Sequence, residues 1–139
     1  MCGIAGLLYP RELQNPGPDN MNLQLRSMAN AMEHRGPDGE GFWQSPDTRI
    51  GLAHRRLAII DLSPDAAQPM TSGDDRIWAT FNGEIYNHMI LRHELENMGH
   101  RFQTDHSDTE VLIHGCRAWG IEGLANRLEG MFALAIWDM

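Results

Sequence analysis

Short apolar runs separated by turn residues make up the first part of the chain. Residues 4–9 form one such run, which ends at a proline and predicts a short buried strand. Two further runs, residues 41–44 and 50–61, predict strands of the same kind. Residues 11–20 and 63–75 are rich in Pro, Gly and Asp and are predicted as loops.

The segment between the first two predicted strands follows a helical period instead. Its apolar positions recur three or four residues apart and would line one face of an α-helix: Met21, Leu25, Met28 and Met32. Gly36 and the proline after it end the pattern. We therefore expect one amphipathic helix with this face turned to the core.

A strand and a second helix follow the second predicted loop. Residues 76–82 carry the apolar and β-branched side chains typical of a strand, and residues 88–99 have the periodicity of a helix. Asn87 stands at the expected N-cap, where its side chain could accept a hydrogen bond from the first turn. Gly99 stands where this helix should end.

The last part of the chain predicts a third helix, a short fourth helix and a final strand. Ser107, with Glu110 three positions later, fits a capping box that opens a helix through Trp119. A short helix is expected around residues 121–128. Residues 131–137 form a strongly apolar run and are predicted as a buried strand.

The order of these elements predicts the fold class. Strands and helices are mixed without the alternation that builds a parallel sheet, so we expect an α+β fold with mainly antiparallel sheets. No repeat or linker divides the 139 residues, which predict one domain. The sequence stops at Met139 directly after an apolar strand, whose edge would lack a partner. We therefore expect the sequence to be cut inside a larger fold.

Composition argues against several classes of partner. The formal net charge is −8 and no basic stripe is present, so a nucleic-acid partner is not expected. The apolar runs are too short to span a membrane, and the first residues lack the pattern of a signal peptide. Of the two cysteines, Cys2 and Cys116, both are expected as free thiols in the cytoplasm.

The seven histidines do not predict a metal site. His88 and His93 are five residues apart, which places them off a common helix face, and no pair of cysteines supports them. His114 and Cys116 are two residues apart on a predicted helix and therefore diverge. We expect polar or surface roles for the histidines, with His54 packed near Arg56.

Cys2 is one processing step from being the N-terminal residue. Removal of Met1 would leave a thiol and a free amine on the same residue. Their ordinary pKa values are about 8.5 and about 7.7–8.0, so transfer of the thiol proton to the amine costs little. Cys2 could then act as a nucleophile that carries its own base. The alternative role is that of a small buried residue at the start of a strand.

Five motifs resemble the glutaminase domain of glutamine-dependent asparagine synthetases, in the same order along the chain. They are MCGIAG, EHRGPDGEG, GLAHRRLAIIDLSPDAAQPM, FNGEIYNH and SDTEVL. The chain is thus similar to class II glutamine amidotransferases of the N-terminal-nucleophile hydrolase fold. HRRLAIIDLS and NGEIYN resemble the asparagine synthetase branch more than the sugar-phosphate or phosphoribosyl amidotransferases. The implied fold is a four-layer αββα sandwich, truncated at its C-terminus.

The resemblance assigns the reaction to three residues. Cys2 would attack the side-chain amide of glutamine, which creates a tetrahedral oxyanion. Asn82 and Gly83 would form the oxyanion hole with a side-chain NH₂ and a backbone N–H. Taken alone, the Asn-Gly dipeptide is equally typical of an ordinary turn.

The resemblance also assigns residues to the two charged groups of the amino acid. Arg56 would bind the α-carboxylate, since its guanidinium can donate two parallel hydrogen bonds. Asp108 would hold the α-ammonium with help from Glu84, although both could also be solvated surface charges, and Asp108 suits a helix N-terminus. The backbone at Ile59 and Ile60 is a weaker candidate for a glutamine contact.

The segment EHRGPDG closes near the nucleophile in the proteins that this chain resembles. Its residues Arg35, Gly36 and Asp38 are expected to organise the pocket without taking part in chemistry. Read alone, the segment is a helix terminator followed by a turn.

The implied activity is hydrolysis of L-glutamine to glutamate and ammonia for an ATP-dependent asparagine synthetase domain. Residues 1–139 would be an incomplete glutaminase domain, and the synthetase domain, in cis or in trans, is absent. No cofactor is expected in this chain, and ATP and Mg²⁺ belong to the missing domain. Two alternatives stay open: an amidotransferase with a different acceptor, and a non-catalytic module that binds glutamine or a partner. A homodimer also stays open.

Overall fold

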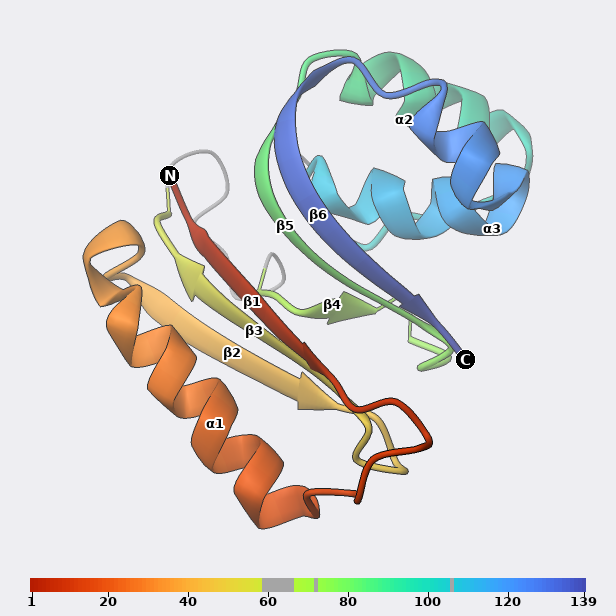
Figure 1. Ribbon diagram of the computed structural model, residues 1–139. Coiled ribbons are helices and arrows are strands. Elements are labelled where there is room, and N and C mark those ends of the chain that lie inside the picture. Colours follow the sequence, from red (N-terminus) through yellow and green to blue (C-terminus); the bar gives the residue numbers. More distant parts are fainter. Residues whose placement is uncertain (59–66, 72, 106) are drawn as a thin grey trace.

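Two three-stranded antiparallel sheets face each other in the computed structural model (Figure 1). The structure describes residues 1–58, 67–71, 73–105 and 107–139. The first sheet has the order β1–β3–β2, with β1 (Gly3–Leu8), β3 (Ile50–Arg56) and β2 (Gly39–Gln44). The second has the order β4–β5–β6, with β4 (Met70–Thr71), β5 (Ile77–Ile85) and β6 (Gly130–Asp138).

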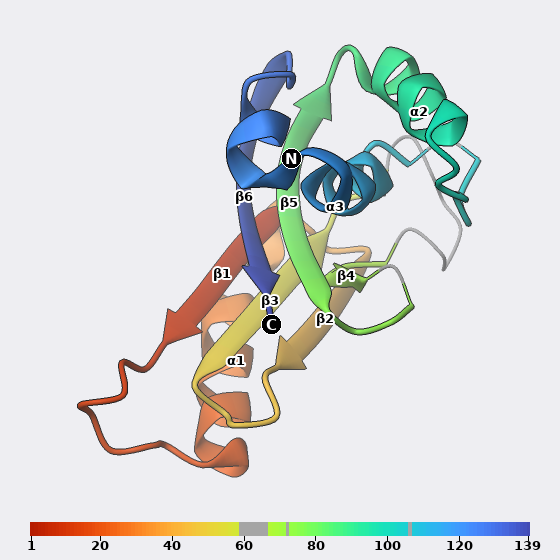
Figure 2. The same ribbon diagram turned by 90° about the vertical axis from the view of Figure 1, so that its right-hand side faces the viewer.

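Helices cover the outer face of each sheet, which gives the fold four layers. α1 (Pro18–Ala31) lies on the first sheet and continues into a short 3₁₀ helix, η1 (Glu33–Arg35). α3 (Thr109–Ala125) lies on the second sheet beside α2 (His88–Asn97), as two perpendicular views show (Figures 1 and 2). The predictions of an α+β class and of four αββα layers are confirmed. No helix in the described ranges is long and apolar enough to cross a bilayer.

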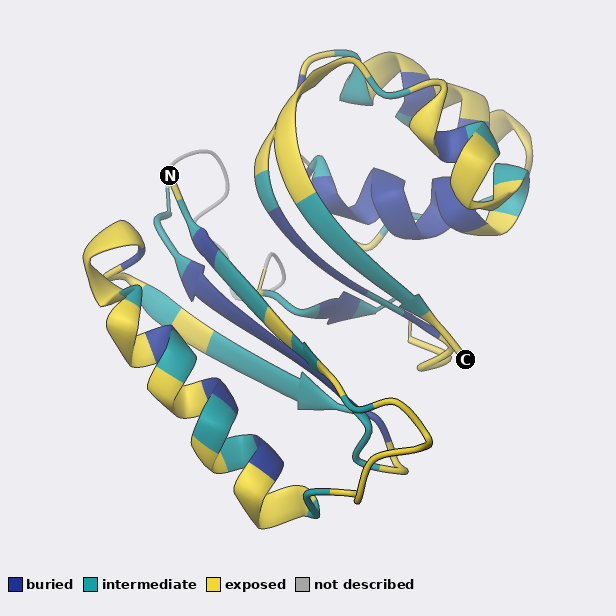
Figure 3. Cartoon of the chain, viewed as in Figure 1, coloured by how far each residue is buried: buried dark blue, intermediate teal, exposed yellow. Residues whose placement is uncertain are grey.

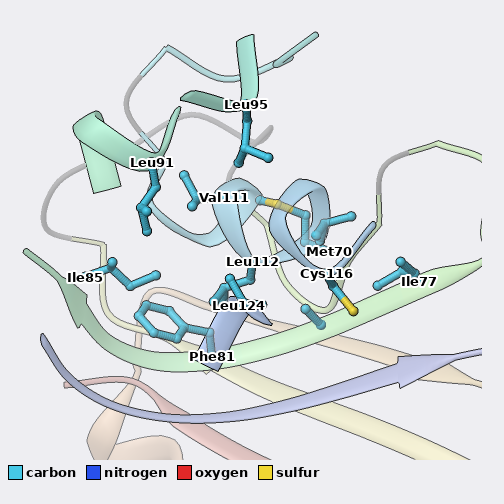
Figure 4. Close-up of a cluster of buried hydrophobic side chains, with 12 residues drawn as sticks. Met70, Ile77, Phe81, Ile85, Leu91, Leu95, Val111, Leu112, Cys116 and Leu124 are labelled. Atoms are coloured by element: carbon cyan, nitrogen blue, oxygen red, sulfur yellow. The ribbon is translucent and has the colours of Figure 1, made fainter. Parts of the chain in front are cut away.

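Each helix layer shares a hydrophobic core with its own sheet (Figure 3). Between α1 and the first sheet the core consists of Met21, Leu25, Ala29 and Ala53. The core between the second sheet and its helices is larger and includes these side chains (Figure 4): Phe81, Ile85, Leu91, Leu95, Val111, Leu112 and Leu124. The opposite face of each sheet is turned toward the other sheet.

The buried row of α1 differs from the prediction at its C-terminal end. Met21 and Leu25 are buried as expected, but the third buried position is Ala29. Met28 and Met32 are only half-buried. Side chains four residues apart lie on one face of a helix, and the face formed by Met21, Leu25 and Ala29 packs on the sheet. The predicted face steps by three residues from Leu25 to Met28 and so turns partly away from the sheet.

Strand lengths depend on partners that the sequence pattern does not reveal. β3 ends at Arg56, so the prediction of a strand through residue 61 is wrong for residues 57 and 58, and residues 59–61 lie outside the described ranges. β5 continues to Ile85, three residues beyond the predicted end, because β6 pairs with its whole length. β4 lies in a segment that was predicted as a loop.

The N-cap position predicted for α2 is confirmed, but the capping hydrogen bond does not form. Asn87 precedes the helix as expected, but its side chain makes no capping hydrogen bond. Its Nδ2 donates to the Arg127 carbonyl at 2.8 Å, and its Oδ1 accepts from the Glu129 N–H at 3.1 Å. Asn87 therefore ties the start of α2 to the segment that leads into β6.

The predicted capping box at Ser107 is wrong, because Asp108 is the N-cap residue of α3. The Glu110 carboxylate accepts hydrogen bonds from the backbone N–H groups of Gln103 and Thr104 at 2.7 and 2.9 Å. Burial alone would raise the pKa of Glu110, but hydrogen bonds from His114, Thr104 and Gln103 outweigh it and lower the pKa to about 2. Glu110 anchors the preceding loop instead of closing its own helix.

A glycine divides the third helix as the sequence predicts. Gly120 has a φ of 69°, and the helix bends there, so that two helical segments meet inside α3. A left-handed φ suits glycine, which lacks a Cβ. The expectation of one helix through Trp119 and a short one after it is confirmed, although the second segment ends at Ala125 and does not reach residue 128.

Candidate active site

Strand alternation places the candidate residues on the faces that the two sheets turn toward each other. Ala53 of β3 packs on α1, so its neighbour His54 and then Arg56 point toward the second sheet. Phe81 of β5 packs on α3, so Asn82 points toward the first sheet. The N-terminus, the end of β3 and the second half of β5 lie at the same end of the sandwich (Figures 1 and 2).

Cys2 lies beside Arg56. β1 pairs with β3 with Gly3 opposite Arg55, and one more step in this register brings Cys2 opposite Arg56. The Cys2 Sγ lies 3.4 Å from the backbone nitrogen of Leu57 and 3.7 Å from its carbonyl oxygen. The sulfur is half-buried at the end of β3.

The neighbouring Arg55 has a different role. Its guanidinium forms ion pairs with Glu40 at 2.8 Å and Glu33 at 3.5 Å, on the α1 side of the sheet. Since successive strand residues alternate, only Arg56 of this pair of arginines faces the second sheet. Cys2 thus lies next to Arg56, the arginine to which the resemblance assigns the α-carboxylate.

The segment after α1 holds the backbone around Cys2. Arg35 Nε donates to the Cys2 carbonyl at 3.1 Å. A Cβ at Gly36 would collide with the Arg55 carbonyl group, so only glycine allows this approach. These contacts fit the expectation that the segment organises the site.

Asp38 holds the chain where it leaves β3. Its N–H donates to the Arg56 carbonyl at 3.0 Å, and its carboxylate accepts from the Ala58 N–H at 2.9 Å. Asp38 therefore fixes the backbone on both sides of Leu57, whose amide contacts the Cys2 sulfur.

The Gly83 N–H points away from β6. Tyr86 donates to the Glu129 carbonyl at 2.7 Å, and Met139 donates to the Arg76 carbonyl at 3.0 Å. In an antiparallel ladder, hydrogen-bonded pairs alternate along each strand. With the continuous register of this pair, the even-numbered residues of β5 bond to β6, and the N–H of Gly83 faces the opposite edge.

Two side chains occupy that edge on either side of Gly83. The Phe81 N–H donates to Gln68 Oε1 at 2.6 Å, and the Ile85 N–H donates to Asp108 Oδ2 at 3.1 Å. The intervening Gly83 N–H is thus aimed into the space between these two bonded amides. This geometry suits a donor for an oxyanion and does not fit a simple two-residue turn.

Gly83 cannot be replaced without moving β6. Its φ is 156°, and a Cβ would collide with the Met131 carbonyl oxygen and with Phe132. Glycine is therefore required at this position for the close approach of β5 and β6, whether or not a ligand binds there.

Asp108 and Glu84 lie near the same end of β5. Burial raises the pKa of Asp108, and the nearby Glu84 charge adds to this, while the Ile85 N–H and the charge of His88 act in the opposite direction. Glu84 is exposed. Asp108 precedes α3 but bonds to β5 instead of capping its own helix. Ile59 and Ile60 lie outside the described residues.

His54 is buried on the face of β3 that is turned toward the second sheet. The sequence predicts only that it packs near Arg56. Burial lowers the pKa of His54 to about 4, the Phe81 backbone opposes this, and the Arg56 charge adds to it. Its side chain is 2% exposed, and its Nε2 has no partner of ordinary hydrogen-bond geometry among the described residues. His54 thus lies on the inner face of β3, two residues before Arg56 and against the backbone of β5 at Phe81.

The depressed pKa of His54 predicts a pH dependence of stability. An unfolded histidine has a pKa of 6.5, whereas folding lowers that of His54 to about 4. The unfolded state binds the proton more tightly, so this stabilisation is complete above pH 6.5 and is lost as the pH falls toward 4. The full loss is on the order of 3 kcal/mol.

Chemical denaturation of wild type and His54→Gln at several pH values checks this expectation. His54→Gln should remove most of the decline between pH 6.5 and 4, while the exposed His93→Gln should keep it. The lowered pKa of His100, due to burial and to His114, acts in the same direction and remains in both variants. Equal slopes in wild type and His54→Gln would contradict the prediction.

The His, Cys, Asp and Glu side chains in the described part of the chain form no group of three or more that could hold a metal ion. Cys2 and Cys116 are free thiols.

Comparisons with known proteins agree on one family. The family model described as "Glutamine amidotransferase domain" matches residues 1–139. The chain is 42% identical over 139 residues to asparagine synthetase [glutamine-hydrolyzing] 1 of Bacillus subtilis, covering 99% of this chain and 21% of that protein. It is 37% identical over 138 residues to asparagine synthetase [glutamine-hydrolyzing] 1 of Arabidopsis thaliana, covering 99% and 22%. The chain thus spans about a fifth of the length of the curated relatives it matches.

A solved structure shows the same fold. Glutamine phosphoribosylpyrophosphate amidotransferase from Bacillus subtilis, complexed with ADP and GMP, superposes with a TM-score of 0.64. The match covers 99% of this chain and 34% of that one, at 21% sequence identity. This likeness confirms the predicted four-layer fold.

Proposed function

The chain belongs to the family of glutamine amidotransferase domains, and on this premise we propose that it hydrolyses L-glutamine to glutamate and ammonia. One observation carries the proposal: the Gly83 N–H points to the open edge of β5 between two amides that are already bonded. Cys2 directly precedes β1, and Arg56 ends β3 in the facing sheet. The N-terminus and the end of β3 lie at the same end of the sandwich as the second half of β5 (Figure 1). This placement supports a site in which a nucleophile, an oxyanion donor and a carboxylate ligand surround one substrate.

The reaction begins once Met1 has been removed. The free α-amine of Cys2 takes the thiol proton, and the thiolate attacks the side-chain carbonyl carbon of glutamine. The carbonyl oxygen becomes an oxyanion, which the Gly83 N–H and the Asn82 NH₂ stabilise. The C–N bond then breaks, the protonated amine returns its proton to the leaving nitrogen, and ammonia departs from a thioester on Cys2. Water attacks the thioester, which releases glutamate and restores the thiol.

The charged ends of glutamine select the substrate. Arg56 donates to the α-carboxylate, and Asp108 with Glu84 accepts from the α-ammonium. The Asp108 carboxylate already accepts from the Ile85 N–H at 3.1 Å, which fixes its position beside Gly83. An amino acid held at these two points presents its side-chain amide to Cys2.

The ammonia has a use outside this domain. Asparagine synthetases [glutamine-hydrolyzing] are the relatives matched over 99% of this chain, which supports delivery to an ATP-dependent synthetase domain in cis or in trans. We assign ATP and Mg²⁺ to that domain and none to residues 1–139. The two free thiols support a cytoplasmic location. A homodimer is the assembly to test by sedimentation.

Replacement of Arg56 by Ala is expected to raise KM for glutamine by about 10- to 100-fold with little change in kcat. The reason is that the carboxylate contact exists equally in the bound substrate and in the transition state. Arg56→Lys should lose less, because it keeps the charge without the planar fork. Steady-state glutaminase kinetics, with the exposed Arg11→Ala as control, measure this. An unchanged KM would exclude Arg56 as the carboxylate ligand.

Release of glutamate and ammonia from L-glutamine by the purified chain tests the proposed function. D-Glutamine and L-asparagine should be poor substrates, because neither satisfies both charge contacts and reaches Cys2. Binding of L-glutamine without turnover would favour a non-catalytic module instead.

A further inference from the structure

Gln68 connects two parts of the site that are distant in the sequence. Its Oε1 accepts the Phe81 N–H at 2.6 Å, and its Nε2 donates to Thr109 Oγ1 at 3.2 Å. Phe81 directly precedes Asn82, and Thr109 directly follows Asp108. One amide side chain therefore spans from the strand of the oxyanion donors to the start of the helix that carries the ammonium ligand.

This bridge lies where the second sheet lacks a further strand. β4 pairs only with Trp78 and Ala79 of β5, so the edge beyond Ala79 has no strand partner among the described elements. Gln68 bonds to the N–H of Phe81 there, and Asp108 bonds to the N–H of Ile85. Two side chains thus take the place of a neighbouring strand on either side of Gly83.

The backbone of Gln68 lies against the first sheet. A Cβ at Gly41 of β2 would collide with the backbone carbonyl of Gln68, so the two chains are in direct contact. The Cα hydrogen of Gly41 that a Cβ would replace faces the second sheet, because the side chain of the neighbouring Phe42 packs on α1. Gln68 is therefore anchored on one sheet by its backbone and on the other by its side chain.

We propose that Gln68 is a positioning residue, which holds the Gly83 N–H and the Asp108 carboxylate at the spacing that glutamine hydrolysis requires. The inference rests on the proposed glutaminase function. Gln68 does not touch the substrate: it acts through Phe81 on one side and Thr109 on the other. Loss of either hydrogen bond allows β5, which carries Asn82 and Gly83, to shift relative to the start of α3.

Gln68→Met removes the donor and the acceptor while it keeps the length of the side chain. We expect kcat to fall about 100-fold, the loss typical of a misplacement of about 1 Å, and KM to rise by a smaller factor. The oxyanion contact develops only in the transition state and so affects kcat, whereas the Asp108 contact is made by bound glutamine and so affects KM. The exposed Gln14→Met, which is the same substitution outside the site, should match wild type.

Thr109 provides a second, independent test of the bridge. Thr109→Val keeps the shape of the side chain but lacks the hydroxyl that accepts from Gln68, and should lower kcat by about tenfold. Thr109→Ser restores the hydroxyl and should recover wild-type kcat. Each kcat is normalised to the sites that react with a chloroketone analogue of L-glutamine, so that misfolded protein does not count.

Amide hydrogen exchange followed by NMR separates this inference from the proposed function. Gln68→Met should speed exchange of the Phe81 amide by tenfold or more and leave the β6-bonded amide of Thr80 unchanged. If wild type lacks glutaminase activity, the proposed function fails, while the exchange result still tests the bridge. Wild-type kcat per titrated site in Gln68→Met, or failure of Thr109→Ser to recover kcat, would overturn the positioning role.

Discussion

Replacement of Cys2 by Ala is expected to abolish ammonia release from glutamine, with a loss of at least about 10⁴-fold in kcat. The thiol is the only proposed nucleophile, and no neighbouring group can form the thioester in its place. Alanine also permits removal of Met1, so the variant keeps the free amine and isolates the loss of sulfur. A coupled assay for glutamate measures the effect.

The second cysteine supplies the control for this experiment. Cys116 is buried in the core beneath the second sheet, and burial raises the pKa of its thiol. Cys116→Ala should lower stability slightly and keep kcat per folded molecule. Glutaminase activity that persists in Cys2→Ala would remove the basis of the proposed mechanism.

Asn82→Ala is expected to lower kcat by about 10²- to 10³-fold, with a small change in KM. The side-chain NH₂ would contact the substrate oxygen fully only when negative charge develops, so its loss raises the barrier by about 3–4 kcal/mol. Steady-state kinetics with L-glutamine give both constants. Gly83 is a poorer test, because any side chain there collides with β6.

Asn97→Ala, at the exposed end of α2, is the matched control for Asn82→Ala. It should leave both constants unchanged. If Asn82→Ala lost less than threefold in kcat, Asn82 would not be an oxyanion donor, and the side chain that stabilises the oxyanion would have to be another one.

The regular elements follow from local patterns, because strand alternation, helical periodicity and glycine breaks act over short distances. The break at Gly120 is one example, since a left-handed φ is cheap only for glycine. The side-chain capping bonds predicted for Asn87 and Glu110 do not form, for the opposite reason. Asn87 and Glu110 have the right chemistry for caps, but their partners are the Arg127–Glu129 segment and the Gln103–Thr104 backbone. A local rule cannot choose between a near and a distant partner.

The site shows the same limit of sequence-based prediction. The resemblance selected Cys2 and Arg56, but their adjacency depends on the β1–β3 register, which is set by packing on α1. His54 and Gln68 were not predicted as site residues. His54 is distinguished by burial between the sheets, and Gln68 by bonds to two distant elements. Neither property leaves a signal in one sequence.

Mass spectrometry of the protein treated with the chloroketone analogue of L-glutamine tests the role of Cys2 most directly. Intact mass reports whether Met1 is present, and peptide mapping locates the adduct. The account predicts a polypeptide that lacks Met1 and carries one adduct on Cys2, with none on Cys116. An active protein that retains Met1, or an adduct on any residue other than Cys2, would contradict it.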